Sequence, residues 1–351
     1  MLGRPVASAA CQTVQLHGGT LGDVRLLSGT AVLDDGESRP FRVVRKEQRK
    51  WERPGDPGSW RREADLYESF LAEAFTPSFR RPECYHLESG DDVTVLWLEY
   101  LTGVSGRSLT TTMLEAAAYG LGLFQRRAGR DGRFGDIPCL GDEGFLSREF
   151  SQWHTQSYSL EYLVSDGCRL PAFLKESLRS GKIALAEGKS LEYACLRSPA
   201  CGIPAHIRGM IEGLDGMQEA VFSRLARQPI VLCHRDFWTE NVFYLEGSVA
   251  LIDWDTAGWG YAGEDVASLI FDETDPDKYI ELNRRMVPAY ANGLGLPDSA
   301  LPHLRQDVLT MALMKFGYRM VQRVAFAQEP EEKAAGIAAL QAFYDLFRDT
   351  D

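Results

Sequence analysis

The stretch Pro229–Asp255, PIVLCHRDFWTENVFYLEGSVALIDWD, decides the fold of this chain. It contains three short apolar runs, at residues 229–233, 242–245 and 249–252, and the third is partly β-branched. Glu246-Gly247 supplies turn chemistry between the second and third runs, so these two runs predict a β-hairpin. The whole stretch is expected to form a strand, a loop, a strand, a tight turn and a final strand.

Polar side chains in this stretch cannot all belong to a core. Asp236 and Asn241 follow the first run and Asp253 follows the third, so the hairpin would bring two carboxylates and an amide to one sheet edge. Mg²⁺ prefers such oxygen ligands. A protein that transfers a phosphoryl group mainly positions the acceptor hydroxyl and neutralises phosphate charge. The pattern therefore predicts a metal and phosphate site; the alternative is a solvated acidic turn beside a hairpin.

The spacing of these residues resembles a known family. His234–Asp236 (HRD) with Asn241 resembles the catalytic loop of protein kinases, and Asp253 stands where those enzymes carry the Asp of their DFG element. Here Trp254-Asp255 follows in place of Phe-Gly, which is closer to the aminoglycoside phosphotransferase and choline kinase family. We identify the chain as resembling that family.

The resemblance implies a fold class and a division of the chain. The fold is expected to be α+β and bilobal, like a protein kinase, with a small antiparallel sheet and a larger, mainly helical part. The N-terminal lobe would comprise residues 1–101, a five-stranded sheet plus one helix that contact the phosphates of the nucleotide. The C-terminal lobe would comprise residues 102–351, with the catalytic loop at 234–241 and the metal loop at 253–255.

The resemblance also implies roles for single residues. Asp236 would orient and deprotonate an acceptor hydroxyl, while Asn241 and Asp253 would hold Mg²⁺, and all three count as catalytic. His234 and Asp265 would give structural support. Asp265 is expected to accept hydrogen bonds from backbone amides of the catalytic loop, although it could also cap the helix that begins near residue 266.

In the N-terminal lobe, a glycine-rich turn and a lysine are the expected phosphate contacts. Gly19 and Thr20 lie in HGGTLG, between two predicted strands, where backbone amides could approach phosphate oxygens. Lys46, on the strand 41–46, would reach the α- and β-phosphates, and a slip of one residue would put Arg45 there instead. Glu63 is the expected partner of the lysine, because a carboxylate fixes the geometry of a desolvated ammonium.

Other elements frame the nucleotide site. Ser59 is expected to cap a helix over residues 60–74, and the threonines at 110–112 to cap a helix that ends near Arg127. The stretch VTVLWLEYLTG resembles the hinge between the lobes. There the backbone groups of Glu99 and Leu101 would bind the adenine edge.

The acceptor site is less well defined by the sequence. Residues 131–228 read as a mostly helical insertion, and in the resembled family such an insertion helps to form the acceptor site. The role of Arg235 stays open, because the family more often has a small residue there, and Asp255 could join the metal or contact the substrate. The candidate substrate contacts are Asp255, Trp153, Asp272 and Glu273; for the last three, core packing or a solvated acidic loop is the alternative.

Composition narrows the choice of partners. The chain has 351 residues, of which 44% are hydrophobic and 25% charged, typical of a globular protein. Its net charge of -12 argues against nucleic acid as a partner, since phosphate backbones require basic surfaces. The acidic balance is compatible with a cationic acceptor, or it serves solubility alone.

The cysteines and the apolar runs bear on location. The 7 cysteines form no CxxC pair, which favours reduced thiols over a disulfide framework or a zinc site. The N-terminal residues lack the apolar core of a signal peptide, and no run approaches the roughly 20 apolar residues of a membrane helix. We therefore expect a cytoplasmic protein without a membrane partner.

These observations predict an ATP-dependent O-phosphotransferase that uses Mg²⁺ and transfers the γ-phosphate to a hydroxyl of a small molecule. The acceptor could be an antibiotic, which would make the enzyme a resistance factor, or another natural product. Two alternatives stay open: a kinase of Ser or Thr hydroxyls in a peptide that matures into a natural product, and a pseudokinase that only binds nucleotide. The choice between ATP and GTP, the acceptor and the oligomeric state do not follow from the sequence.

Overall fold

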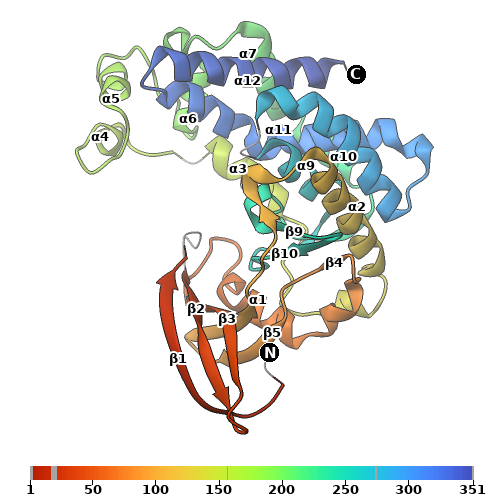
Figure 1. The fold of residues 1–351 in the computed structure, drawn as a ribbon. Helices are drawn as coiled ribbons and strands as arrows, with labels where there is room; N and C mark the ends of the chain where they lie inside the picture. The colour runs from red at the N-terminus through yellow and green to blue at the C-terminus, as the bar shows by residue number, and fades with distance from the viewer. Residues whose placement is uncertain (1–2, 17–21, 156, 273–274, 350–351) are drawn as a thin grey trace.

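A computed structural model describes residues 3–16, 22–155, 157–272 and 275–349. A β-sheet built from the N-terminal residues lies at one end of the molecule, helices fill the other end, and the strands β9 and β10 lie between them (Figure 1). This mixed arrangement confirms the predicted α+β, kinase-like fold. The division into lobes at residues 101 and 102 stays a prediction.

The N-terminal sheet has five strands in the order β1-β2-β3-β6-β5, and every neighbouring pair is antiparallel. A turn at residues 34–36 separates β2 from β3. The first strand is exposed along its whole length, as an edge strand can be. The strands are β1 (Val6–Gln15), β2 (Gly22–Leu33), β3 (Ser38–Arg49), β5 (Cys84–Ser89) and β6 (Val93–Glu99).

One face of this sheet is covered by α1 (Ser59–Glu68). Ala64 packs with Leu96 and Leu98 of β6, and Val44 of β3 lies against the same small core. Because side chains alternate along a strand, Lys46 shares the face of Val44 and points toward α1. The expected cap was wrong: Ser59 is already inside the helix, which follows Gly58 without a side-chain cap.

The Pro229–Asp255 stretch folds as predicted. β8 (Ile230–Cys233) precedes the catalytic loop, and β9 (Val242–Leu245) pairs with β10 (Ser248–Leu251) in an antiparallel hairpin. The backbone φ angles at Glu246 and Gly247 are 41° and 100°, the positive values that a tight two-residue hairpin turn favours. Since Leu251 pairs with Val242, the residues that flank the hairpin, Asn241 and Asp253, meet at one end of it.

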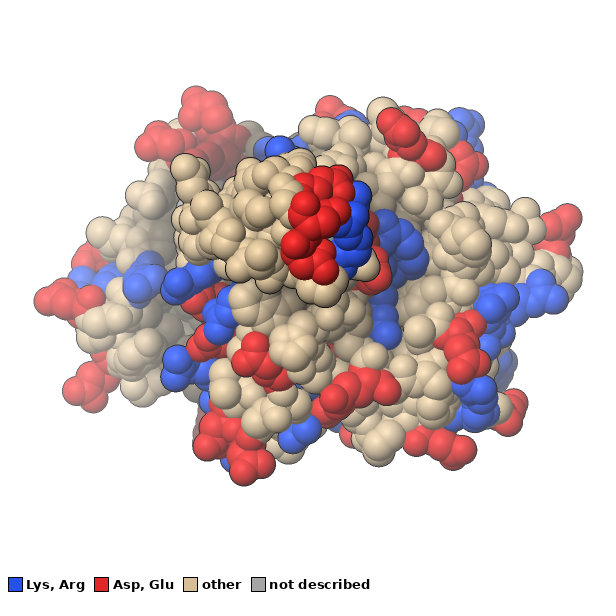
Figure 2. All heavy atoms as spheres, turned by 60° about the horizontal axis from the view of Figure 1, so that its bottom comes forward, with Lys and Arg blue, Asp and Glu red and all other residues tan. Residues whose placement is uncertain are grey.

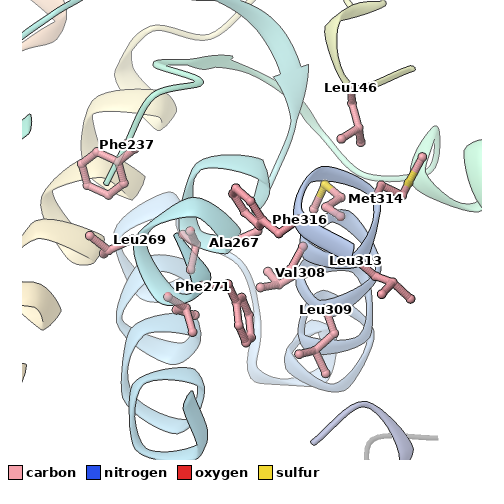
Figure 3. Packing of buried hydrophobic residues seen from close by; sticks show 14 of the residues in the cluster. Leu146, Phe237, Ala267, Leu269, Phe271, Val308, Leu309, Leu313, Met314 and Phe316 are labelled. Atoms are coloured by element: carbon pink, nitrogen blue, oxygen red, sulfur yellow. The ribbon is translucent and has the colours of Figure 1, made fainter. Parts of the chain in front are cut away.

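The core of the helical part lies between α9 (Glu264–Phe271) and α11 (Leu301–Phe326), where Ala267 and Phe271 pack near Val308 and Phe316 (Figure 3). Phe237, which follows the predicted base directly, is also fully buried in this core. The catalytic loop is therefore anchored in the largest hydrophobic cluster of the described residues.

Two glycines allow α2 (Thr111–Arg127) and α10 (Tyr279–Leu294) to approach closely. A Cβ at Gly122 would lie 2.3 Å from the Tyr290 carbonyl oxygen, and one at Gly293 would lie 2.1 Å from that of Tyr119. The predicted cap of α2 is present, since Thr110 accepts a hydrogen bond from the Met113 amide at 3.4 Å. Pro288 lies inside α10, although proline usually interrupts a helix.

The insertion at 131–228 consists of short helices, as predicted, and some of them project from the body of the molecule (Figure 1). Its elements are η3 (Arg133–Asp136), α3 (Phe145–Thr155), α4 (Leu160–Leu163), α5 (Ala172–Arg179), α6 (Leu191–Arg197), η4 (Pro199–Cys201), α7 (Ala205–Gly216) and α8 (Gln218–Leu225). The other elements are η1 (Phe70–Ala74), β4 (Phe79–Arg80), β7 (Val104–Ser105), η2 (Gly106–Ser108), η5 (Thr239–Asn241), β11 (Gly258–Tyr261), η6 (Pro276–Lys278), η7 (Asp298–Ala300) and α12 (Pro330–Arg348).

None of the helices in the described part of the chain combines the length and the apolar composition that crossing a bilayer requires.

Candidate active site

A lysine and two carboxylates from three separate segments meet where the sheet faces the hairpin. The Lys46 ammonium donates to Glu63 Oε2 at 2.5 Å and to Asp253 Oδ1 at 2.6 Å. Arg45 points to the opposite face, where its guanidinium bonds Glu47 at 2.7 Å. The pairing of Lys46 with Glu63 is therefore present, and the lysine, rather than its neighbour, faces Asp253.

The charges in this cluster are strongly coupled. Burial opposes the charged form of Lys46, but Asp253, Glu63 and Asp255 outweigh it and hold its pKa well above the usual value. Burial would raise the pKa of Asp253, yet the Lys46 ammonium lowers it, so Asp253 is ionised at neutral pH. Lys46 and Arg53 also lower the pKa of Asp255, but burial and the charge of Asp253 outweigh them and raise it to about 7.

Asp236 and Asn241 are joined directly. The Asn241 side-chain amide donates to the Asp236 carboxylate at 2.8 Å and to the Asp236 carbonyl at 2.9 Å. This fixes the orientation of the Asn241 amide, so its oxygen is left for another partner. Burial and the charge of Asp253 raise the pKa of Asp236, while Lys315 and the bond from Asn241 oppose the rise. A raised pKa makes a carboxylate a better acceptor of a hydroxyl proton.

The backbone of the catalytic loop is held by Asp265. Its two carboxylate oxygens accept the amide protons of His234 at 2.8 Å and of Arg235 at 2.7 Å. The predicted bonds to loop amides are thus present, and Asp265 makes them from the first turn of α9, whose N-cap is Gly263. Burial and the charge of Glu264 raise the pKa of Asp265 to about 6.

His234 links the two loops. It is fully buried, its ring nitrogen Nε2 lies 2.9 Å from the Ile252 carbonyl oxygen, and its ring packs edge-on against Trp254. Since a carbonyl can only accept, Nε2 carries the proton. Burial lowers the pKa of His234 to about 4, so the ring is neutral at pH 7. His234 therefore fixes the catalytic loop against the segment that leads to Asp253.

Arg235 has a structural position that the sequence did not reveal. Its side chain is buried and its guanidinium donates to the carbonyl oxygens of Trp259, at 2.7 Å, and of Asp142. Its φ of 70° lies in the left-handed region, which is uncommon for a residue other than glycine. Arg235 thus ties the insertion and β11 to the catalytic loop, and this explains why a large side chain is accommodated here.

The residues present fit a divalent cation bound together with phosphates. Asp253 offers a carboxylate with 31% of its side chain exposed, and Asn241 offers an amide oxygen. Within the described ranges, no group of three or more His, Cys, Asp or Glu side chains is placed so that it could hold a metal ion by itself. Mg²⁺ is commonly bound by one or two carboxylates with the remaining positions filled by water and phosphate oxygens. Asn241 and Asp253 suit that mode of binding.

Other predicted nucleotide contacts lie as follows. The Glu99 carboxylate is bonded by Arg80 at 2.5 and 2.8 Å, and its amide donates to the Glu83 carbonyl at 2.8 Å. The Leu101 amide makes no hydrogen bond within the described part of the chain. Gly19 and Thr20 lie outside the described residues.

The predicted substrate contacts are dispersed. Trp153 is partly buried and packs against the main core. Asp272 forms an ion pair with Arg319 at 3.2 Å, and Glu273 lies outside the described residues. Asp255 is the last residue of the metal loop, and its carboxylate lies 3.7 Å from the Arg53 guanidinium. The structure brings Asp255, but not Trp153, to the Lys46 cluster.

Sequence reasoning missed Arg62, whose side chain is only 3% exposed. Its guanidinium forms a double hydrogen bond with Asp56, at 2.5 and 2.8 Å, and donates to the carbonyl oxygens of Asp255 at 2.9 Å and of Cys139 at 2.5 Å. Next to it, Glu63 Oε1 accepts the Trp254 amide at 3.4 Å. Two successive residues of α1 therefore hold the metal loop, and no pattern in the sequence marks Arg62 for this contact.

A pocket of about 760 Å³ borders the catalytic loop at Thr239. Its other walls come from η2, the start of α2, η6, α10 and α11. Three cationic side chains and one carboxylate line it, with several hydroxyls; the lining comprises Gly106, Arg107, Ser108, Leu109, Thr110, Thr111, Leu114, Thr239, Asp275, Pro276, Lys278, Leu282 and Arg323. Its volume lies in the range typical of small-molecule sites.

Charge on the outer surface gives no competing site on the face that Figure 2 shows. Acidic and basic side chains occur there in mixed clusters, without one continuous basic field. Nucleic-acid surfaces concentrate Lys and Arg on one face.

Comparison with protein families gives one match. The sequence model described as "Phosphotransferase enzyme family" matches residues 28–300, which is more than half of the chain. The match includes the catalytic loop, the metal loop and Asp265. A search of curated proteins gave no match.

Solved structures with a similar fold are kinases by title. An ethanolamine kinase of Plasmodium vivax has a TM-score of 0.52 at 12% identity, over 97% of this chain and 83% of the other. A choline kinase of Cryptosporidium parvum has a TM-score of 0.54 at 13% identity, over 97% and 89%. An amicoumacin kinase has a TM-score of 0.51 at 14% identity, over 95% and 88%. At these identities the likeness concerns the fold alone.

Proposed function

The chain belongs to the phosphotransferase enzyme family and is a kinase that acts on a hydroxyl group, and from this premise we propose that it transfers the γ-phosphate of ATP to a small molecule. The observation that carries the proposal is the convergence of Lys46, Glu63 and Asp253 beside the joined pair Asp236–Asn241. The amicoumacin kinase that shares this fold was solved with AMP-PNP and Ca²⁺. We propose a comparable pair, ATP and Mg²⁺, for this enzyme.

In this proposal the nucleotide lies between the sheet and the helical part. Lys46 contacts the α- and β-phosphates, and Glu63 holds the lysine in place. Asn241 and Asp253 hold Mg²⁺, which would supply neutralisation of phosphate charge when bound. We propose that the Glu99 carbonyl and the Leu101 amide bind the adenine edge and that Gly19 and Thr20 contact the phosphates.

Asp236 accepts the proton of the acceptor hydroxyl. Its carboxylate is oriented by Asn241, and its pKa is raised by burial and by Asp253, which suits a base that takes a proton from an alcohol during transfer. The attacking oxygen then approaches the γ-phosphorus in line with the leaving oxygen. Asp265 and His234 support this geometry through the loop backbone.

We place the acceptor in the pocket of about 760 Å³, because Thr239 in its wall is three residues from Asp236. Its size supports a small molecule such as an antibiotic, another natural product or an amino alcohol. Of its charged lining residues, Arg107, Lys278 and Arg323 are cationic and Asp275 is anionic. The pocket lining itself therefore gives no preference for a cationic acceptor, in contrast to the acidic balance of the whole chain.

The proposal is tested by nucleotide consumption with a panel of hydroxyl compounds: aminoglycosides, macrolides, amino alcohols, sugars and Ser- or Thr-containing peptides. We expect ATP turnover with at least one small molecule, and none for Asp236→Ala under the same conditions. Turnover with peptides only would favour the peptide kinase alternative.

A pseudokinase would bind nucleotide without turnover. Binding of ATP and Mg²⁺ to the wild-type chain, measured by calorimetry, together with no consumption across the whole panel would support that alternative. Replacing ATP by GTP in the productive reaction identifies the preferred nucleotide.

A further inference from the structure

Lys315 is a buried cation that the proposed reaction does not use. It lies in α11 between Met314 and Phe316, which belong to the core shown in Figure 3, and only 7% of the residue is exposed. The position falls outside the residues that the family comparison matches. A charge in such surroundings costs free energy unless nearby groups stabilise it.

The contacts of Lys315 are all to neutral groups. Its ammonium donates to the Ser268 hydroxyl at 2.8 Å and to the Arg235 carbonyl at 3.1 Å, and it lies near the rings of Phe145 and Phe316. Within the described ranges, no carboxylate lies within ion-pair distance of it. An ion pair with a neighbour therefore does not explain why a lysine stands here.

The carbonyl that Lys315 holds is the one directly before Asp236. Arg235 has a φ of 70°, so its peptide needs contacts that maintain this uncommon conformation. The Arg235 amide is held by Asp265 and its carbonyl by Lys315. Ser268, the second partner of Lys315, stands three residues after Asp265 on α9. The same helix therefore supplies Asp265, which holds the Arg235 amide, and Ser268, which binds the Lys315 ammonium.

The charge of Lys315 also acts on the loop carboxylates. It opposes the rise in the pKa of Asp236 caused by burial and by Asp253, and it does the same for Asp265, where burial and Glu264 raise the pKa. At low local dielectric such interactions persist beyond contact distance. The positive charge of the ammonium is thus balanced by Asp236 and Asp265 at a distance, rather than by a carboxylate in direct contact with it.

We propose that Lys315 is a positioning residue for Asp236: its ammonium fixes the Arg235 carbonyl and thereby the orientation of the carboxylate that follows. The catalytic consequence rests on the proposed phosphotransfer. The structural consequence, a catalytic-loop backbone held by α11, does not.

The first test follows the loop itself. Hydrogen exchange is measured on peptides that cover residues 232–241 in the wild type, in Lys315→Met and in Tyr318→Phe. Tyr318 is a matched control, since it is a buried polar residue one turn further along α11 that contacts His154 and Asp215 instead of the loop. We expect Lys315→Met to raise exchange at the His234 and Arg235 amides by roughly tenfold, while Tyr318→Phe leaves it unchanged. Unchanged exchange in Lys315→Met overturns the proposal.

The second test separates kcat from KM. With an acceptor identified by the panel, Lys315→Met is expected to lower kcat by roughly 30-fold, while KM for nucleotide stays within about threefold, because Lys46 and Glu63 are not affected. Lys315→Gln, which keeps a donor but no charge, should fall between Lys315→Met and the wild type. Equal kcat in all three proteins contradicts the proposal.

The two tests distinguish a failure of the proposed function from a failure of the proposed role of Lys315. If no acceptor supports turnover, the proposed function fails, and the exchange experiment still decides the role of Lys315. If Lys315→Met does not fold, Lys315→Gln takes its place in both measurements. Faster exchange of the loop amides in Lys315→Gln would then support the proposed role of Lys315, and exchange at the wild-type rate would contradict it.

Discussion

Two buried polar clusters of this molecule differ in their charge balance. At the metal loop, the carboxylates of Glu63, Asp253 and Asp255 surround the single ammonium of Lys46, with one further cation, Arg53, 3.7 Å from Asp255. In the insertion, a hydrogen-bonded chain runs from Lys189 through His154 and Tyr318 to Asp215. The first cluster has an excess of negative charge, and the second has one ammonium and one carboxylate.

The difference indicates which cluster serves a ligand. Excess buried negative charge is relieved by a divalent cation, whereas a chain that pairs one ammonium with one carboxylate needs no added ion and joins helices. The insertion chain connects α3, α7 and α11, and burial together with Lys189 keeps the pKa of His154 low, so the ring is neutral. We therefore regard the metal-loop cluster as functional and the insertion cluster as structural.

The largest effect is expected from the carboxylates at the catalytic and metal loops. Asp236→Ala or Asp253→Ala should lower kcat by roughly a hundredfold or more, since each removes a group that acts in the transition state. Only Asp253→Ala should also weaken nucleotide binding in the presence of Mg²⁺. Steady-state kinetics and calorimetry measure both quantities. Asp91→Ala, an exposed carboxylate between β5 and β6, is the control; near-wild-type turnover in both loop variants would contradict the assignment.

The next effect concerns the lysine and its partner. Lys46→Met and Glu63→Gln should each lower kcat/KM for nucleotide by roughly 30-fold, and the double variant should be little worse, because the two side chains act as a unit. Arg45→Met is a matched control on the opposite face of β3 and should stay within about twofold. Strictly additive losses in the double variant would show that the pair does not work together.

A smaller loss of activity, with a loss of stability, is expected for Arg62→Met. Removing one partner of a buried ion pair leaves Asp56 uncompensated and should cost about 3 kcal/mol of unfolding free energy. Activity should fall by roughly tenfold, because Asp255 and the metal loop lose a contact. Denaturant unfolding and kinetics are compared with Arg61→Met, whose pair with Asp65 is on the helix surface and contributes at most about 0.5 kcal/mol.

The smallest effect on activity is expected in the insertion cluster, where pH is the variable. Burial raises the pKa of Asp215 to about 6, above the unfolded value of about 3.9. The contribution of the Asp215 carboxyl to the free energy of unfolding is therefore fully present below about pH 4, where the group is protonated in both states. This contribution is lost as the pH rises through 6, a change of about 2 to 3 kcal/mol. Asp215→Asn cannot titrate and so avoids this loss. The unfolding free energy of the variant should therefore increase relative to that of the wild type between pH 4 and 7.

Thermal or denaturant unfolding at both pH values provides the measurement, and activity at pH 7 should stay within about twofold of the wild type. A parallel pH dependence in Asp215→Asn and the wild type would place the titrating group elsewhere. A large loss of activity would show that the insertion cluster is functional, and the contrast between the two clusters would then fail.

Much of the active site could be predicted because its parts are close in sequence. The hairpin between Asn241 and Asp253 is short, its turn has glycine at a position with positive φ, and its strands are apolar. Local rules therefore bring the two side chains together. The position of Lys46 was harder to predict. Alternation along a strand places Lys46 and Arg45 on opposite faces, but it does not show which of the two faces meets α1. The contact with Asp253 decides it in favour of Lys46 over Arg45.

Other features could not be predicted, because they depend on contacts between distant segments. Arg62 joins Asp56 to the Cys139 and Asp255 carbonyls, and no local pattern marks a guanidinium that binds backbone carbonyls. Lys315 reads as one polar residue in a helix that the sequence describes only as amphipathic. The expected cap at Ser59 failed because the helix begins one residue earlier, where packing of α1 on the sheet outweighs capping preference.

The sequence by itself determined the family, the hairpin and the identity of the residues proposed to hold metal and phosphate, because oxygen-bearing side chains at short spacing indicate a metal and phosphate site even without coordinates. The tertiary structure alone decided which face of β3 meets the carboxylates, how Arg62 and Lys315 contact the loops, and where a pocket borders the catalytic loop at Thr239. These depend on the packing of α1, α9 and α11, and packing is a property of surfaces that meet in space rather than of residues adjacent in the chain.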